Sequence, residues 1–278
     1  MDTFKLVNLV KSDESILSQD TDLSICLKAD GFFFTLIDSN YVLRAVGEFD
    51  VDLSLGMTSV MTNIRNCFAS IGIRIFNFAN IKVICLTNKN IFVPYKLYDN
   101  SKTKDYLRGV ANIVSSDTII ENISERLDAV SVFAFPMHQY SATKILMSKA
   151  KFYSQHQAMA EYCFDISKLA NNTVVLHKRE NACDMVVFKG AKFTYSNSFD
   201  FNNEHDMIYQ ILFAFEKLDI DVEDVNFLIT GIEYTHEEKK VLNRHIKSVL
   251  YTNPMELIKV GCEFDGVSMQ KYFLTLVK

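Results

Sequence analysis

The sequence predicts a duplicated α/β fold, in which two units with the same order of elements face each other across a cleft. The main observation is a repeat: GEFD around Phe49 returns as NSFD around Phe199, an offset of 199 − 49 = 150 residues that Asp50 and Asp200 share. In each copy, three short apolar runs precede the Phe-Asp pair and an amphipathic segment follows it. Short apolar runs followed by a helical period are typical of an α/β unit, and a chain of 278 residues is long enough for two domains.

The first copy begins with three predicted strands, at residues 23–28, 31–37 and 41–46. Turn-forming residues separate the strands, with Asp30-Gly31 in the first gap and residues 38–40 in the second. We therefore expect a meander of antiparallel strands. Phe32, Phe33 and Phe34 are consecutive, so both faces of this strand are apolar, which indicates a mixed sheet covered by helices on both sides.

A helix follows at residues 57–71, because its apolar residues recur at helical spacing and Gly72 can end it. An uninterrupted apolar run predicts a strand at 81–86. Residues 152–169 show no clear period, and we expect them to connect the two halves. The rest of this half is predicted as a loop at 94–105, a helix near Tyr106, a strand at 130–135 and a helix at 136–151.

The second copy repeats this order, and its helix and strand ends carry clear signals. Asn202 or Asn203 can cap the helix after the third strand, and Thr235 with Glu238 forms a capping box for a later helix. We expect domains at residues 1–155 and 156–278. The predicted elements are strands at 173–177, 184–189, 192–196 and 225–229, a helix from Thr235 through Val249, and beyond Pro254 a short strand and an apolar segment at 272–277.

Composition and charge narrow the classes of function. The chain has 9 glycines and 3 prolines, where average usage would give roughly 19 and 14. The shortage matters because turns that hold phosphate use glycine for close backbone approach. The net charge of −5 disfavours binding to nucleic acid or to an anionic membrane surface.

The N-terminal segment and the cysteines predict the location of the protein. The first residues are partly acidic and contain no long apolar run, so they do not form a signal peptide. No stretch approaches the roughly 18 uninterrupted apolar residues of a membrane-spanning helix. Cys26, Cys85 and Cys163 stand among apolar neighbours and no CxxC pair occurs, as is typical of free thiols in a reducing compartment. We expect a soluble cytoplasmic protein without membrane insertion.

The order of three meandering strands, a helix and a further strand resembles the ribonuclease-H-like unit. Two such units in tandem resemble the actin-like ATPase superfamily, and cytoplasmic platform proteins of type II secretion and type IV pilus assembly have a similar fold without being enzymes. The second half is also similar to an uncharacterised bacterial domain-of-unknown-function family with this duplicated fold. The similarity covers mainly residues 184–231 and includes Lys189-Gly190, Tyr195, Asn197 to Phe199, Asp206, Tyr209 and Thr230-Gly231.

The resemblance to actin-like ATPases implies a nucleotide site in the cleft, but the motifs for that site are degenerate. Members of the superfamily place an Asp-x-Gly turn between the first two strands of each half, where backbone amides meet phosphate and the acid positions a metal. Here the first turn is Asp30-Gly31 followed by Phe32 and Phe33, which predicts an ordinary hairpin turn. The second turn, at residues 178–183, contains no glycine.

The adenosine motif of the superfamily ends a strand with paired glycines. In this chain the strand ends at Thr230-Gly231, and the bulky Ile232 takes the place of the second glycine. A Thr-Gly strand end is also typical of any tight strand-to-helix turn, which is the interpretation we favour. If the cleft does hold ATP and Mg²⁺, the resemblance implies Asp30, Gly31, Thr230 and Gly231 as the cofactor-binding residues, with Asp30 as the metal-positioning acid.

Other catalytic constellations are not supported by the spacing of residues. A two-metal nuclease needs several carboxylates that converge, but Asp30 and Asp38 belong to turns and Asp50 lies beyond the third predicted strand. The histidines show no HxxxH or HxH spacing, no serine lies in a GxSxG elbow, and no cysteine has a histidine close in sequence. We therefore expect no catalytic residue and no metal ligand. The acids considered are Asp22, Asp30, Asp38, Asp50 and Asp117.

These observations favour a non-catalytic cytoplasmic interaction or scaffold protein with a degenerate actin-like ATPase fold and no cofactor. Its partner would be another protein or a second copy of the chain, and neither nucleic acid nor membrane. The alternative is a divergent ATP-binding ATPase or phosphotransferase with its nucleotide in the interdomain cleft. A third possibility is nucleotide sensing without turnover.

Overall fold

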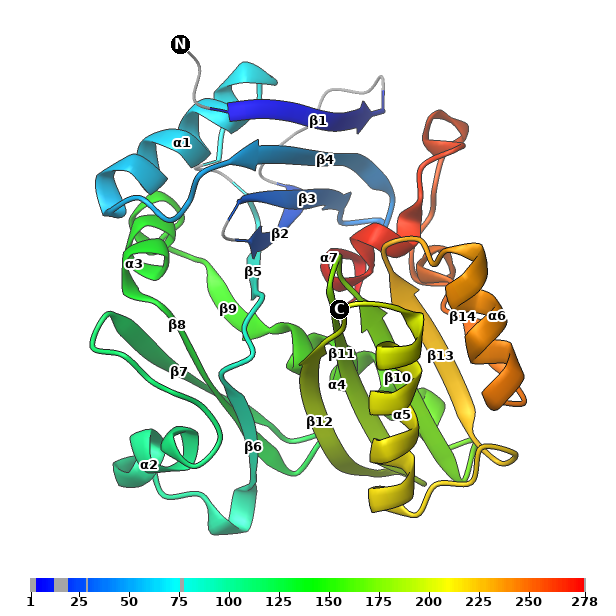
Figure 1. The fold of residues 1–278 in the computed structure, drawn as a ribbon. Coiled ribbons are helices and arrows are strands. Elements are labelled where there is room, and N and C mark those ends of the chain that lie inside the picture. The colour runs from blue at the N-terminus through cyan, green and yellow to red at the C-terminus, as the bar shows by residue number, and fades with distance from the viewer. Residues whose placement is uncertain (1–3, 13–19, 29, 76–77, 278) are drawn as a thin grey trace.

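In the part of the chain that the structure describes, the strands form two large mixed sheets and one small antiparallel sheet (Figure 1). The computed structural model describes residues 4–12, 20–28, 30–75 and 78–277. The first sheet has the order β1 (Phe4–Lys11), β4 (Leu43–Val51), β3 (Gly31–Asp38), β2 (Thr21–Lys28), β5 (Ile81–Cys85) and β9 (Lys151–Ser154). The second has the order β12 (Lys192–Asp200), β11 (Ala182–Lys189), β10 (Asn172–Lys178), β13 (Asn226–Gly231) and β14 (Val249–Tyr251). The small sheet has the order β6 (Asn90–Pro94), β8 (Ala129–Pro136) and β7 (Asp117–Ser124).

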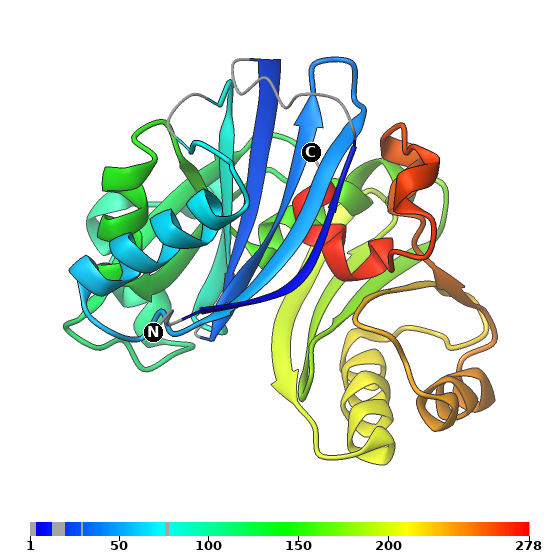
Figure 2. The ribbon, with the colours of Figure 1, turned by 90° about the horizontal axis from the view of Figure 1, so that it is seen from above.

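The helices lie in layers around the two large sheets (Figure 2). One pair covers the outer face of the first sheet, and a second pair covers the outer face of the second sheet. Two further helices, α4 and α7, lie between the sheets. The first contacts strands of both sheets, and the second contacts strands of the first sheet and α4. The helices are α1 (Met57–Ser70) and α3 (Met137–Leu146) on the first sheet, α5 (Glu204–Leu218) and α6 (His236–His245) on the second, α4 (Gln155–Ser167) and α7 (Phe273–Leu276) between them, and α2 (Thr103–Arg108) on the small sheet.

The two large sheets contain the same unit, as the repeat predicts. In the first, β2, β3 and β4 pair antiparallel in succession, α1 crosses the sheet, and β5 returns parallel to β2. In the second, β10, β11, β12, α5 and β13 follow the same path with the same pairing. The marker acids occupy equivalent positions, since Asp50 pairs with Gly31 at the start of β3 and Asp200 pairs with Ala182 at the start of β11. The predicted duplication is confirmed.

The two crossing helices are held by aromatic packing against their sheets. Phe68 of α1 is fully buried, and its ring centroid lies 5.4 Å from that of Phe32 and 5.0 Å from that of Phe34. Phe215 of α5 packs in the same way on Phe227 of β13, at 5.9 Å. Of the two predicted caps of α5, Asn202 and Asn203, the structure has Asn203, whose side-chain oxygen accepts hydrogen bonds from two backbone amides in the first turn.

Several predictions for the first half are wrong. The chain adds a strand, β1, at the edge of the first sheet, and β4 runs on to Val51, so that Asp50 lies inside the third strand and not beyond it. The predicted loop at 94–105 contains the end of β6 and short helical turns, and β7 was not predicted. Alternation in β7 is weak because most of its side chains are half-buried, which leaves little period-2 signal.

The segment predicted as a structureless connection, 152–169, is β9 followed by α4, and α3 ends at Leu146 and does not reach residue 151. The reason is burial: α4 is enclosed between two sheets, and its buried residues include polar ones such as Gln155, His156 and Gln157. A helix that is covered on nearly all sides shows no amphipathic period.

Two boundaries in the second half also differ from the prediction. The capping box of Thr235 and Glu238 is present, but α6 ends at His245, and the following residues form β14 beside β13. The short strand expected beyond Pro254 is instead a series of 3-10 turns that leads into α7. The predicted domain boundary between residues 155 and 156 falls in the first turn of α4, and because that helix contacts both sheets the boundary stays a prediction.

None of the helices in the part of the chain that the structure describes has the length and apolar character of a membrane span.

Candidate functional site

A pocket of about 460 Å³ opens between the two halves, where the equivalent β2–β3 and β10–β11 turns face each other. This volume lies within the range of small-ligand sites, roughly 300–1,000 Å³. We call it the cleft pocket. Its lining divides into apolar side chains, four cations and four acids: Phe33, Leu86, Ala182 and Ile232; Lys28, Lys178, Arg179 and Lys271; Asp30, Glu48, Glu180 and Asp200; His177 and Asn181 complete it.

In the first half, two of the cations share one carboxylate. Glu48 of β4 is almost fully buried, and its two oxygens accept from Lys28 of β2, at 3.3 Å, and from Lys271 near the C-terminus. Since β3 and β4 are adjacent strands, Glu48 is held at a fixed position below the first turn. The contact with Lys271 also attaches the C-terminal segment to the first sheet.

The cations of the second half are likewise paired within the chain. Lys178 ends β10 and contacts the Glu238 carboxylate, which also forms the capping box of α6. Arg179 donates two hydrogen bonds to Asp184 of β11, with its Nε at 2.9 Å and its Nη2 at 3.0 Å. This bidentate contact occupies one edge of the guanidinium with a carboxylate of the chain itself.

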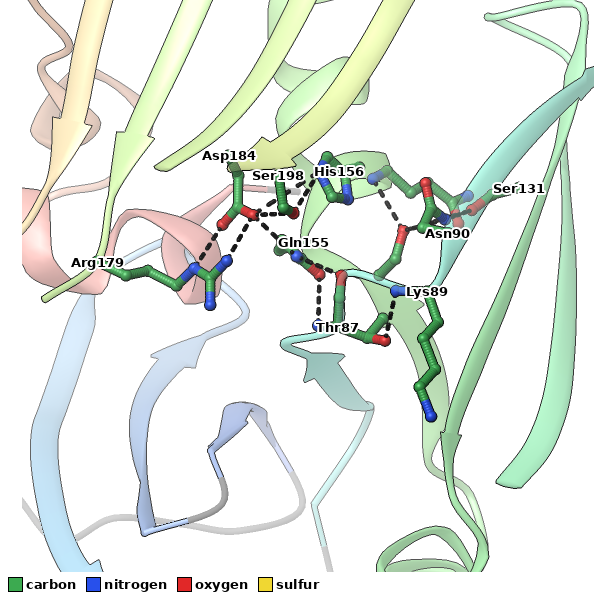
Figure 3. A network of polar contacts seen from close by, with 11 residues as sticks. Thr87, Lys89, Asn90, Ser131, Gln155, His156, Arg179, Asp184 and Ser198 are labelled. Carbon is green, nitrogen blue, oxygen red and sulfur yellow. Dashed lines mark hydrogen bonds and ion pairs between the residues drawn. The ribbon is translucent and has the colours of Figure 1, made fainter. Parts of the chain in front are cut away.

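Asp184 is the centre of a buried polar network that joins the two sheets (Figure 3). Its carboxylate accepts hydrogen bonds from Ser198, at 2.6 Å, and from the Gln155 amide, at 3.1 Å, besides those from Arg179. Burial alone would raise the pKa of Asp184, but the positive Arg179 and the other partners hold the pKa below its usual value. Asp184 is therefore a charged anchor that is fully occupied by its neighbours.

Gln155 connects this anchor to the first half. Its side-chain amide donates to the Thr87 carbonyl at 2.7 Å and accepts from the Thr87 backbone N–H at 3.1 Å (Figure 3). Thr87 follows β5 directly, so one side chain at the start of α4 links the end of a strand in the first sheet to Asp184 in the second. The sequence carries no signal for this role, because Gln155 lies in the segment without a hydrophobic period.

Ser198, His156 and Asp184 bring together the residue types of a serine hydrolase, but their geometry is different. The same nitrogen of the histidine, Nε2, lies 3.2 Å from the Ser198 oxygen and 3.7 Å from the Asp184 carboxylate. In a catalytic triad the acid binds the other nitrogen and the serine bonds only to the histidine. Here Ser198 donates directly to Asp184, and His156 Nδ1 has no partner in the described part of the chain. The cluster is structural.

The structure brings only part of the sequence-predicted nucleotide set to the cleft pocket. Asp30 lines the pocket, with its side chain 75% exposed and 4.0 Å from Lys28. Ile232 also lines it, whereas Gly31, Thr230 and Gly231 are not among the lining residues.

The two glycines of that set have structural roles. A Cβ atom on Gly31 would lie 2.1 Å from the Phe49 carbonyl oxygen, and one on Gly231 would lie 2.1 Å from that of Lys178. Gly231 also has a φ of +99°, which favours glycine. Both glycines therefore allow a close approach between neighbouring segments of backbone.

Sequence reasoning missed the acids that decide the electrostatics of the site, Glu48, Asp184 and Glu238. Glu48 lies within the GEFD stretch but is not one of the residues that the two copies share, and Asp184 begins a predicted strand, so neither stood out by spacing. In the part of the chain that the structure describes, no group of three or more His, Cys, Asp or Glu side chains is placed to hold a metal ion.

Two solved structures have the same architecture. A protein with actin-like ATPase fold and unknown function from Bacteroides thetaiotaomicron matches with a TM-score of 0.76 and 22% identity, over 92% of this chain and 96% of that one. The PilM–PilN type IV pilus biogenesis complex matches with a TM-score of 0.60 and 12% identity, over 92% of this chain and 96% of that one. The chain therefore has the actin-like ATPase fold, built from two tandem ribonuclease-H-like units, as its resemblance implied.

A comparison with protein families gives one match that spans most of the chain. The model described as "Protein of unknown function (DUF3822)" matches residues 11–249. No curated protein matches the sequence.

Proposed function

The chain belongs to the DUF3822 family of proteins of unknown function, and we propose that it is a non-catalytic protein that acts by binding a protein partner. A single observation carries this proposal: each of the four cations that line the cleft pocket is already paired with a carboxylate of the chain itself. A pocket whose cations are each held by a carboxylate of the chain, two of them by the shared Glu48, has less attraction left for a triphosphate.

The cost of freeing these cations supports the proposal. A phosphate that took Lys178 from Glu238 would leave a carboxylate that is nearly buried without its partner. Removing one partner of a buried ion pair typically costs about 3–5 kcal/mol. Arg179 and Asp184 present the same difficulty, because Asp184 is fully buried.

The backbone of the second turn also fits a nucleotide poorly. The Arg179 N–H donates to the Ala182 carbonyl at 2.8 Å, so it is used inside the turn. The turn contains no glycine, and the open side of Gly231 faces the Lys178 backbone and not the pocket. ATP and Mg²⁺ therefore do not fit the residues present, and we assign them no role in a reaction.

The PilM–PilN complex offers a precedent for the kind of partner. It contains a protein of this fold in a complex with another protein. We infer by analogy that the chain described here binds a protein, either a different chain or a second copy of itself. Six free cysteines, of which five are buried, agree with a cytoplasmic location, which we propose together with a bacterial origin.

The competing function is a divergent ATPase or phosphotransferase. Two observations favour it: the size of the cleft pocket, and the exposed Asp30 carboxylate in the turn where the actin-like superfamily places its metal-positioning acid.

A thermal-shift titration separates the two functions. We expect no rise in Tm with ATP and Mg²⁺ at millimolar concentration, and no ATP turnover. A ligand at a hundred times its Kd would stabilise the protein by about 2.7 kcal/mol, which is easily measured. Asp30→Ala and the matched exposed substitution Asp105→Ala, each of which removes one surface ion pair, should behave alike. ATP turnover that Asp30→Ala abolishes and Asp105→Ala does not would establish the enzyme.

A further inference from the structure

We propose that the cleft pocket is the docking site for a basic segment of the partner protein, with an arginine or lysine at the acidic edge of the pocket and an apolar side chain inside it. This inference rests on the proposed function, because a bound nucleotide would fill the same space. It goes further by stating the chemistry of the partner.

The cations and the acids that line the pocket differ in their exposure to solvent. The four cations are all buried or half-buried and paired with acids of the chain. Among the residues that the structure describes, the exposed charged residues of the lining are all acidic, and we call Asp30, Glu180 and Asp200 the acidic rim. Among the described residues, Glu180 and Asp200 form no ion pair, and Asp30 has only a 4.0 Å contact with Lys28, which already binds Glu48. A ligand that approaches the pocket therefore meets uncompensated negative charge.

Such a field selects for positive ligands. Complementary charge at the edge of a site accelerates encounter and rejects partners of the same sign. A polyphosphate would be repelled at the rim before it reached the inner cations. A lysine or arginine side chain would be attracted to Glu180 and Asp200, which form no ion pair among the described residues, without breaking an ion pair of the protein.

Apolar side chains lie deeper in the pocket. Phe33 is 6% exposed and Ala182 is buried, while Leu86 and Ile232 are half-buried. Phe33 is fixed by the Tyr272 ring, at 5.8 Å between centroids and nearly perpendicular. An apolar side chain of the partner would gain the free energy of burial here, as is usual for the anchor of a bound segment.

A polar atom without a partner adds an independent reason to expect a ligand. His177 lines the pocket and is only 4% exposed, yet its Nδ1 has no hydrogen-bond partner within the described residues. Burial lowers the pKa of His177 to about 4, so the ring is neutral at physiological pH. Buried polar groups without partners are rare in proteins. A peptide or guanidinium N–H that enters the pocket would supply the missing hydrogen bond once the ring turns its Nδ1 toward the pocket.

The test is fluorescence anisotropy with three labelled hexapeptides that alternate arginine with leucine, phenylalanine or tyrosine. Matched peptides carry glutamate in place of arginine. We expect at least one arginine peptide to bind the full chain, with affinity that falls as salt rises, and the glutamate peptides not to bind. Failure of all three arginine peptides to bind, or equal binding of the glutamate set, would overturn the inference.

Variants place the peptide in the pocket. The double reversal Glu180→Lys/Asp200→Lys should weaken the arginine peptide about tenfold or more, because attraction at two rim positions becomes repulsion. The matched reversal Glu125→Lys/Glu216→Lys, at exposed acids that do not line the pocket, should change the affinity less than about twofold. Equal losses in both pairs would show that only net charge matters, and the inference would be wrong.

Two further measurements separate the remaining outcomes. His177→Phe keeps a ring of similar size but removes both nitrogens, and we expect the peptide to bind about threefold or more weakly; an unchanged affinity would overturn the hydrogen-bond step. Self-association that the rim reversal abolishes, seen by sedimentation velocity, would make a second copy the occupant and overturn the partner assignment. Binding of ATP would contradict the proposed function itself. If neither ATP nor any of the peptides binds, only this inference is contradicted.

Discussion

At the scale of single residues, the two buried histidines make the fold sensitive to acid. His156 and His177 are 2% and 4% exposed, and burial lowers the pKa of both, to about 4 for His177. The nearby Asp184 carboxylate opposes this effect but does not cancel it. Both imidazoles are therefore neutral in the folded protein and become protonated first in the unfolded chain.

This asymmetry predicts that stability falls as the pH is lowered. The pKa of His177 in the folded protein lies below the unfolded value of 6.5. The stability that the neutral imidazole contributes is therefore complete above about pH 6.5, and it is lost as the pH falls through 6.5 toward 4. For His177 the free energy of unfolding falls by about 3 kcal/mol between neutral pH and the acid end of this window. Urea unfolding at a series of pH values measures the slope.

The slope should become smaller in His177→Phe and stay unchanged in His205→Phe, where the histidine of α5 is exposed. An unchanged pH dependence in His177→Phe would show that the ring is not buried as the structure has it.

A second feature at the residue scale is the ambiguity of a glycine motif. Gly231 resembles one half of an adenosine motif, but its φ of +99° and the Lys178 carbonyl beside it explain its presence without a ligand. A sequence motif shows that a position is glycine. Only the surrounding backbone shows whether a ligand or a close approach of backbone requires glycine there.

At the scale of elements, the repeat pair α1 and α5 carries much of the packing of each half. Phe68 and Phe215 are at most 1% exposed; Phe68 stacks on Phe32 of its sheet, and Phe215 packs edge-on against Phe227. Phe68→Ala or Phe215→Ala should therefore cost roughly 3–5 kcal/mol of the free energy of unfolding, because each leaves a cavity as well as losing contacts.

Matched substitutions on the exposed faces of the same helices give the control. Phe213→Ala on α5 and Met57→Ala on α1, at side chains 45% and 40% exposed, should cost less than about 1 kcal/mol in chemical denaturation. If the buried and exposed substitutions cost the same, the helix faces are misassigned.

The element that the sequence could not reveal is α4. Prediction from periodicity works for α1 and α5 because each has one face in water and one on a sheet. The helix α4 between the sheets has no exposed face to contrast with a buried one. Its buried Gln155 and His156 are polar, so the sequence indicates a loop there and not a helix. The polar network around Asp184 was missed for the same reason, since two of its members start this helix.

At the scale of the whole molecule, the C-terminal segment packs against both halves and links them. Phe273 of α7 packs edge-on against Tyr162 of α4, at 4.8 Å between centroids, and lies 6.1 Å from His177 of β10. On the other side, the Thr35 hydroxyl of β3 donates to the Thr275 carbonyl at 3.2 Å. The last residues of the chain are thus part of a core shared by both sheets.

We therefore predict that Phe273→Ala destabilises both halves together. The loss should be roughly 3–5 kcal/mol, typical of a fully buried aromatic ring, and unfolding in urea should remain a single transition. Hydrogen exchange should show protection lost in β2 and in β10 to a similar extent. Leu250→Ala on the half-exposed β14 is the control. Loss of protection confined to the second half would contradict the shared core.

The sequence by itself determined the duplication, the order of the strands and the crossing helix within each repeat, the capping box of α6, and the absence of a glycine from the second turn. These features are local or periodic, so a single chain read from end to end displays them. Only the tertiary structure decided that Lys28 and Lys271 meet on Glu48, that Arg179 pairs with Asp184, and that three acids remain exposed around the pocket. Pairing of charges depends on distances between segments far apart in the chain, and no spacing in the sequence encodes those distances.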